Sequence, residues 1–205
     1  MAVNDVTSSP TDVGEITVKG QDINNIQAKN VSVSGAKAEY VQGEKIQISQ
    51  AGVNRVEGQN VEVRQGGIQT LRNSGSTTIR QGGVIQAKTN SLSLTQGGVI
   101  LAETTEANLT ASSAGAILSS GDVSLDQSQA KAVFARGEVT MDQSGSGILM
   151  ARSVKTGNNS GVVLLIAGKV DGDVKAVFGP AASAAFGAAF AVAFSLILWI
   201  RRRFL

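Results

Sequence analysis

A unit of 15 or 16 residues recurs along most of the chain, and few folds accommodate such regularity. Each unit opens with an apolar–x–apolar pair, and a second apolar residue follows ten residues after the start. The pairs are Ile16/Val18, Val31/Val33, Ile46/Ile48, Val61/Val63, Thr77/Ile79, Leu92/Leu94, Ala107/Leu109, Val123/Leu125, Val139/Met141 and Val154/Thr156. The second column is Ile26, Val41, Val56, Leu71, Ala87, Ala102, Ile117, Val133, Leu149 and Leu164. Alternation at period two predicts strands with one buried face, and glycine-rich segments between the columns predict turns.

One such unit cannot bury its apolar edge alone, whereas stacked units form a continuous core and pair every strand with the coils above and below. The sequence therefore predicts an all-β fold, a single-stranded β-solenoid of roughly ten coils over residues 15–175, with two short strands in each coil. Residues 1–14 are polar and are expected to form a lead-in or cap for the first open edge.

Glutamine and glycine recur at one corner of the predicted coil. The glutamines are Gln50, Gln65, Gln81, Gln96, Gln127 and Gln143, with Ala111 interrupting the column and Asn158 following it. The glycines are Gly66, Gly67, Gly82, Gly83, Gly97 and Gly98. Stacked amides can donate and accept along the solenoid axis, so the glutamines predict a structural ladder, and the glycines are expected to turn the chain with positive φ. A ligand-binding ladder is the alternative.

The C-terminal end carries a different signal. Residues 176–200 contain no charge, and Pro180 suits the first turn of a helix that would reach roughly 31 Å at about 1.5 Å per residue. This predicts a transmembrane helix, followed by a basic tail over residues 201–205. Its interface anchors would be Trp199, Arg201, Arg202 and Arg203.

Small residues recur at every fourth position of the predicted helix, a spacing that lets helices approach closely in lipid. The two files are Ala181, Ala185, Ala189 and Ala193, and Ser183, Gly187, Ala191 and Ser195. They predict homo-oligomerisation, although an alanine-rich span also produces such files by chance.

A span so close to the C-terminus favours a tail anchor in the cell membrane with the solenoid on the cytoplasmic side. The alternative is an extracytoplasmic solenoid.

Composition argues against most chemistry. The chain has no His and no Cys, and its net charge is only +2, so we expect no catalytic residue, cofactor, metal, nucleic acid or small-molecule substrate. The carboxylates Asp122, Asp126, Glu138 and Asp142 are interpreted as turn or surface residues rather than an acid–base pair.

The charge of one outward column changes along the chain, from positive at Arg64 and Arg80 to negative at Asp126 and Asp142. This column is either an ordinary solvated surface or a surface for side-by-side association of solenoids.

The last coil is apolar on both faces, because Val163 and Leu165 alternate with Leu164 and Ile166. We expect a neighbouring molecule, the membrane surface or the start of the helix to cover it.

The segment "AGKVDGDVKA", residues 167–176, resembles the glycine–apolar alternation of bactofilins, which are polymer-forming bacterial β-solenoids. That resemblance implies a nucleotide-free, membrane-associated scaffold that assembles end to end, although QGG corners and a C-terminal span are not bactofilin hallmarks. The chain also resembles bacterial QGG-repeat proteins with a basic tail, from which no function carries over.

The expected function is a membrane-tethered, non-enzymatic scaffold that binds copies of itself or another membrane protein. The alternative is a surface-exposed adhesin or glycan-binding stalk.

Overall fold

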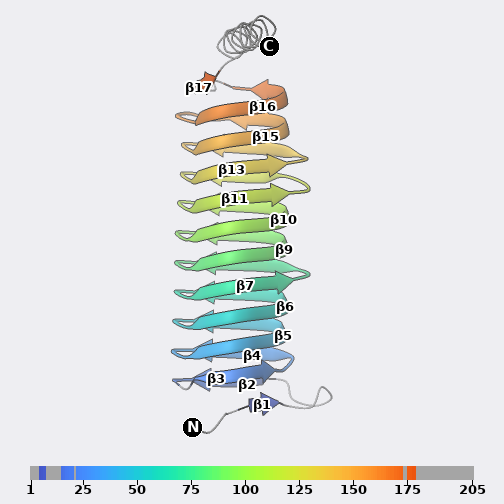
Figure 1. Cartoon of the computed structure of the whole chain (residues 1–205), viewed down its shortest axis with the longest axis vertical. Coiled ribbons are helices and arrows are strands. Elements are labelled where there is room, and N and C mark those ends of the chain that lie inside the picture. The colour runs from blue at the N-terminus through green and yellow to red at the C-terminus, as the bar shows by residue number, and fades with distance from the viewer. Residues whose placement is uncertain (1–4, 8–14, 21, 173–174, 179–205) are drawn as a thin grey trace, which may run out of the picture.

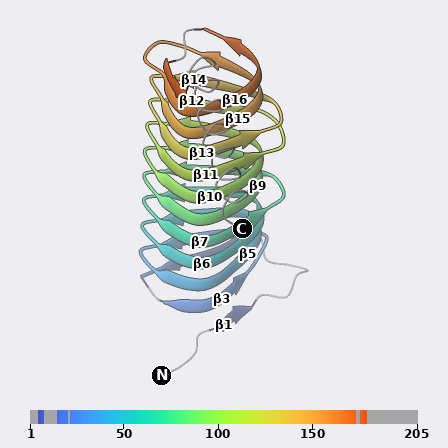
Figure 2. The ribbon, with the colours of Figure 1, turned by 45° about the horizontal axis from the view of Figure 1, so that its top comes forward.

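The chain winds into a parallel β-solenoid of about ten turns (Figure 1). The computed structural model describes residues 5–7, 15–20, 22–172 and 175–178. Every strand pair in these ranges is parallel, and each strand except those at the two ends lies between equivalent strands of the preceding and following coils. Figure 2 shows the coils closing around a common interior. At about 4.8 Å per coil, the stack is about 50 Å long.

The strands follow one another in chain order along the stack. They are β1 (Asp5–Thr7), β2 (Glu15–Lys19), β3 (Ile23–Gln27), β4 (Asn30–Ser34), β5 (Lys37–Ser49), β6 (Gly52–Arg64), β7 (Gly67–Asn73), β8 (Ser76–Arg80), β9 (Gly83–Thr95), β10 (Gly98–Thr110), β11 (Ser113–Ser119), β12 (Val123–Asp126), β13 (Gln129–Ala135), β14 (Glu138–Asp142), β15 (Gly145–Thr156), β16 (Gly161–Asp171) and β17 (Lys175–Phe178).

A complete coil contains three straight segments rather than the two that the sequence predicts. The pairing of β9 with β10 skips Ile100 and Thr105, which divides β10 into a first segment (98–99), a second (101–104) and a third (106–110). At each skipped residue, two neighbouring side chains face outward, so period-two alternation is interrupted and the strand bends. The first bend lies within a continuous strand, so no turn sequence marks it. The second bend falls between two strands in some coils, as at Ser74–Gly75 and Arg136–Gly137.

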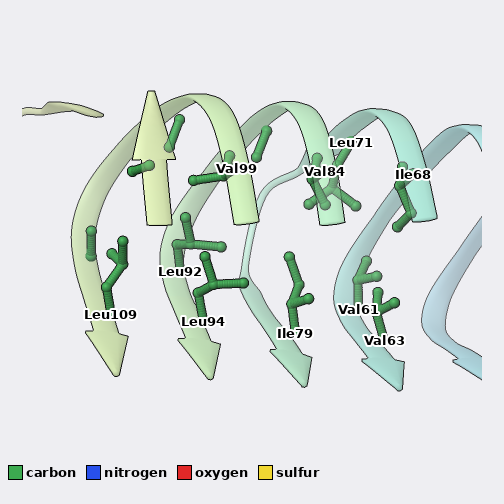
Figure 3. Packing of buried hydrophobic residues seen from close by; sticks show 14 of the residues in the cluster. Val61, Val63, Ile68, Leu71, Ile79, Val84, Leu92, Leu94, Val99 and Leu109 are labelled. Carbon is green, nitrogen blue, oxygen red and sulfur yellow. The ribbon is translucent and has the colours of Figure 1, made fainter. Parts of the chain in front are cut away.

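The buried columns of the sequence form the core. From Ile26 to Leu149, every member of the second column has a relative exposure of 0%. Both members of each apolar–x–apolar pair are buried from Val18 onward. Two of these buried positions hold a polar side chain, Thr77 and Thr156. A further buried column stands in the first segment and was missed by the sequence reading; it comprises Ile23, Ala38, Val53, Ile68, Val84, Val99, Ala114, Ala130, the polar Ser146 and Val162. Figure 3 shows Ile68 and Val84 of this column facing the interior that Val61, Leu71 and Leu92 also fill.

The last unit departs from the predicted register by one residue. Met141 pairs with Thr156, but Leu149 pairs with Leu165, because one extra residue lies between Thr156 and Asn159. Leu165 therefore takes the core position that the sequence assigned to Leu164, and Leu164 is 38% exposed on the outer surface. The assignment of Leu164 to the buried column was wrong.

Both ends of the solenoid extend beyond the predicted boundaries. β1, which lies within the expected lead-in, pairs with β3, so Asp5 is opposite Asn25. β17 pairs with β16, so residues 176–178 belong to a strand and not to the predicted helix. Residues 179–205, which hold the rest of that helix, its interface anchors and the basic tail, lie outside the described residues. No helix in the described part of the chain is long and apolar enough to span a bilayer.

Candidate interaction surface

In most coils the corner before the first segment is turned by glutamine and not by the glycines after it. Positive φ occurs at Gly20 and Gly35 in the first two coils and then in a column of residues with side chains: Gln50, Gln65, Gln81, Gln96, Ala111, Gln127, Gln143 and Asn159. The prediction that Gly66, Gly67, Gly82, Gly83, Gly97 and Gly98 carry positive φ was wrong. The corner of the last unit is at Asn159, one residue after the predicted Asn158, because of the same extra residue.

Hydrogen bonds between the amides stabilise this column, since a left-handed backbone otherwise disfavours a residue with a Cβ. Gln50 Nε2 donates to Gln65 Oε1 at 3.2 Å, and Gln65 Nε2 donates to Gln81 Oε1 at 3.1 Å. Gln81 Nε2 continues the ladder to Gln96 Oε1 at 3.2 Å. The ladder ends there, because Ala111 follows, and no hydrogen bond between the side chains of Gln127 and Gln143 is found in the described residues.

A serine column replaces glycine next to the corner in the later coils. The hydroxyl of Ser112 donates to the carbonyl of Thr110 at 2.7 Å and accepts the backbone N–H of Gly97 at 3.3 Å. Ser128 accepts the N–H of Ser112 at 3.1 Å, and Ser144 accepts that of Ser128 at 3.0 Å. These buried hydroxyls are thus satisfied by the stack itself. The sequence reading missed this ladder, although serine recurs after the corner.

The outward face of the third segment is polar along its whole length. Arg64 lies directly beside Arg80, and Asp126 lies beside Asp142 in the register, so the predicted column does change sign along the stack. Arg64 also forms an ion pair with Glu62 at 2.7 Å. In the described residues, no group of three or more acidic side chains is placed to hold a metal ion.

The outward face of the second segment, which we call face 2, has a different character. Each coil contributes two outward residues to it, one near the start of the segment and one two residues later. These pairs are Asn25/Gln27, Tyr40/Gln42, Arg55/Glu57, Thr70/Arg72, Gln86/Lys88, Leu101/Glu103, Ala116/Leu118, Ala132/Phe134, Ile148/Met150 and Leu164/Ile166. Face 2 is therefore polar and charged over the first coils and apolar over the last four.

The polar half of face 2 is held by contacts between neighbouring coils. The hydroxyl of Tyr40 donates to Glu57 at 3.0 Å, and burial together with this carboxylate raises the pKa of Tyr40. Lys88 forms an ion pair with Glu103 at 3.3 Å in the next coil. These pairs are solvent-accessible, so each contributes at most about 1 kcal/mol.

The apolar half of face 2 forms a continuous stripe along the solenoid axis, which we call the apolar stripe: Leu118, Phe134, Ile148, Met150, Leu164 and Ile166. Leu118, Phe134, Met150 and Ile166 are stacked in register from β11 to β16. Leu118 is 41% exposed and Ile166 is 48% exposed. Contiguous exposed apolar side chains of this kind mark an interaction surface more often than a solvated one.

The sequence predicted only the last coil of this stripe. Leu118, Phe134 and Met150 are 16 residues apart, but each follows a core residue in the second column, so they read as parts of ordinary buried strands. Their outward direction depends on the bend before the second segment, which the sequence does not mark. A shallow groove beside the stripe is lined by Leu118, Phe134 and Met150, by Lys88 and Glu103 of the same column in the preceding coils, and by Arg136.

The C-terminal end of the core is also exposed. Val154 is 1% exposed, but its partner in the following coil, Val170, is 45% exposed. β17 covers only the first part of β16, where Phe178 pairs with Leu164. The exposed end of the core, the apolar stripe and the last described residue are therefore all close to one another.

The fold and its surface define the chain as a parallel β-solenoid with one graded outer face. No protein-family model, curated protein or solved structure matches this chain. The architecture is consistent with that of bactofilins, and the likeness is one of architecture.

Proposed function

We propose that the protein is a membrane-tethered, self-associating structural scaffold without enzymatic activity. The observation that carries this proposal is the apolar stripe, which grows toward the C-terminal coil, where the uncharged residues 179–200 follow. A scaffold needs a rigid body, a fixed attachment and a contact surface. The solenoid, the uncharged segment and the stripe correspond to these three parts.

The contacts made by the charged and buried polar side chains support a structural role. Charged side chains stand on strand faces or bends, where Arg64 contacts Glu62 and Lys88 contacts Glu103, and these pairs are exposed to solvent. The strongly buried polar groups, such as Ser112 and Ser128, bond to backbone groups of their own stack. The hydroxyls of Ser112 and Ser128 are therefore used in holding coils together, whereas the buried hydroxyl of Ser160 has no hydrogen-bond partner among the described residues.

Flotation of the full-length chain with liposomes of phosphatidylcholine and phosphatidylglycerol tests the tether. We expect the protein to float with the vesicles and to stay with them after alkaline carbonate washing, because about 20 apolar residues suffice to span a bilayer. The double variant Phe190→Lys/Phe194→Lys should remain in the aqueous fraction, since each buried charge costs about 2.5–3.5 kcal/mol at the centre of a span.

A variant with a charge change of the same size and opposite sign serves as the control. Lys19→Gln/Lys37→Gln alters two charges on the solenoid far from the C-terminus and should float like the unmodified chain. An unmodified chain that stays in the aqueous fraction would contradict the tether. Digestion of the solenoid by protease added to intact cells that express the chain would support the adhesin or glycan-binding stalk instead.

A further inference from the structure

We propose that the partner on face 2 is a second copy of the chain, packed face to face with a two-fold axis parallel to the solenoid axis. The inference rests on the self-association in the proposed function and adds its surface and geometry. In this arrangement the two stacks run in the same direction, and coils of equal number lie opposite each other.

The two-fold axis has a simple consequence for the outward pairs of face 2. It reverses the strand direction but keeps the level along the stack. The first outward residue of each coil therefore lies opposite the second outward residue of the same coil in the second copy. Complementarity between the two members of each pair thus decides whether the arrangement fits.

Size complementarity is present in the coils of β11 and β13. Ala116 would lie opposite Leu118 of the second copy, so a small side chain receives a large one. Ala132 and Phe134 repeat the relation one coil later, in register with the first pair. In the coils above, Ile148 and Leu164 would meet Met150 and Ile166, which are apolar side chains of similar size. Interdigitation of large and small residues gives the dense packing that apolar interfaces require.

Charge complementarity is present in the polar half. Arg55 would lie opposite Glu57 of the second copy, and each of these pairs occurs twice because of the symmetry. Tyr40 would meet Gln42, whose amide can hydrogen-bond to its hydroxyl. Opposite charges at the same level also fix the register of the two stacks.

An antiparallel arrangement fits less well. A two-fold axis through the coil of Ala132 and perpendicular to the stack would place Phe134 against Phe134 and Ala132 against Ala132. The parallel arrangement avoids these contacts between like residues and leaves both C-termini at the same end, as a common membrane requires.

The size of the stripe indicates that this contact depends on the tether. Four coils of one segment cover about 20 Å by 10 Å, which is well below the roughly 800 Å² per partner of a stable interface in solution. Attachment of both copies to one membrane raises their effective concentration, and a small complementary surface is then sufficient.

Cysteine cross-linking of the full-length chain in liposomes tests the arrangement, and the chain has no native Cys to interfere. Leu118→Cys and Ile166→Cys replace exposed side chains, so both variants should fold. With a short bifunctional maleimide, each variant alone should give at least tenfold more cross-linked dimer than Ser124→Cys, which lies on the polar face of the third segment. In a mixture of the two variants carrying tags of different size, the Leu118–Ile166 product should stay at the control level.

The remaining outcomes each contradict the inference in a distinguishable way. A dominant Leu118–Ile166 product would indicate antiparallel copies whose two-fold axis lies between the coils of Phe134 and Met150. A dimer by mass measurement in lipid nanodiscs without cross-linking at the stripe would place the contact elsewhere and leave the proposed function intact. A monomer would remove self-association from the proposed function as well. If Leu118→Cys in that monomer is protected from a monofunctional maleimide, residues 179–205 of the same chain cover the stripe.

Discussion

Gly82→Ala should lower the free energy of unfolding by about 3 kcal/mol, whereas Gly83→Ala should change it by less than about 0.5 kcal/mol. A Cβ at Gly82 would lie 2.5 Å from the backbone carbonyl oxygen of Gly66 in the preceding coil and 3.2 Å from Ile79 Cγ2. The carbonyl cannot move away without separating two coils. At Gly83 the nearest atom to a new Cβ is 3.7 Å away, so the same methyl group fits.

Urea titration followed by far-ultraviolet circular dichroism measures the difference. The two variants have the same composition and lie next to each other, so the unfolded chains are closely matched. Equal midpoints for Gly82→Ala and Gly83→Ala would mean that the coils do not approach as closely at this corner as the structure shows.

Leu109→Asp should prevent the central coils from folding, with a cost above about 4 kcal/mol. Leu109 is 1% exposed and stands in a column where Leu94 and Leu125 lie directly below and above it. A carboxylate in that column would have no cation or donor among its apolar neighbours.

Asn108→Asp provides the matched control, because Asn108 is the preceding residue of β10 and is exposed. This variant should retain the circular dichroism spectrum and the thermal midpoint of the unmodified chain within a few degrees. Limited proteolysis should cleave Leu109→Asp within the central coils and leave Asn108→Asp uncut. Similar stability of the two variants would contradict the inward direction of Leu109.

The repeating columns were predictable because each coil solves the same burial problem. A position such as Val56 or Ile117 recurs with its neighbours at constant spacing, and stacking like on like is the arrangement that buries all of them. The bends were not predictable in the same way, because at Ile100 and Leu101 two apolar residues in succession face outward. A pattern of alternation cannot distinguish such a pair from a buried strand.

The chemistry of the corner was only partly predictable for a related reason. Glycine is the usual residue at positive φ, and glutamine is not. The structure reverses the expectation, because Gln65 and Gln81 gain amide hydrogen bonds at the turn while Gly66 and Gly82 make room for the adjoining coil. Both effects depend on distances between coils, which a single unit of sequence does not contain.

The central claim, that equivalent residues of successive coils lie next to each other, can be tested most directly with a pair of introduced cysteines. Thr78 pairs with Ser93, and Ser93 pairs with Asn108, all on the outward side of the third segment. A short thiol-specific cross-linker should bridge Thr78→Cys/Ser93→Cys within one chain, since adjacent coils are about 4.8 Å apart. It should bridge Thr78→Cys/Asn108→Cys, two coils apart, at least tenfold more slowly. Equal rates for the two pairs, or no bridge in the first, would contradict the stack.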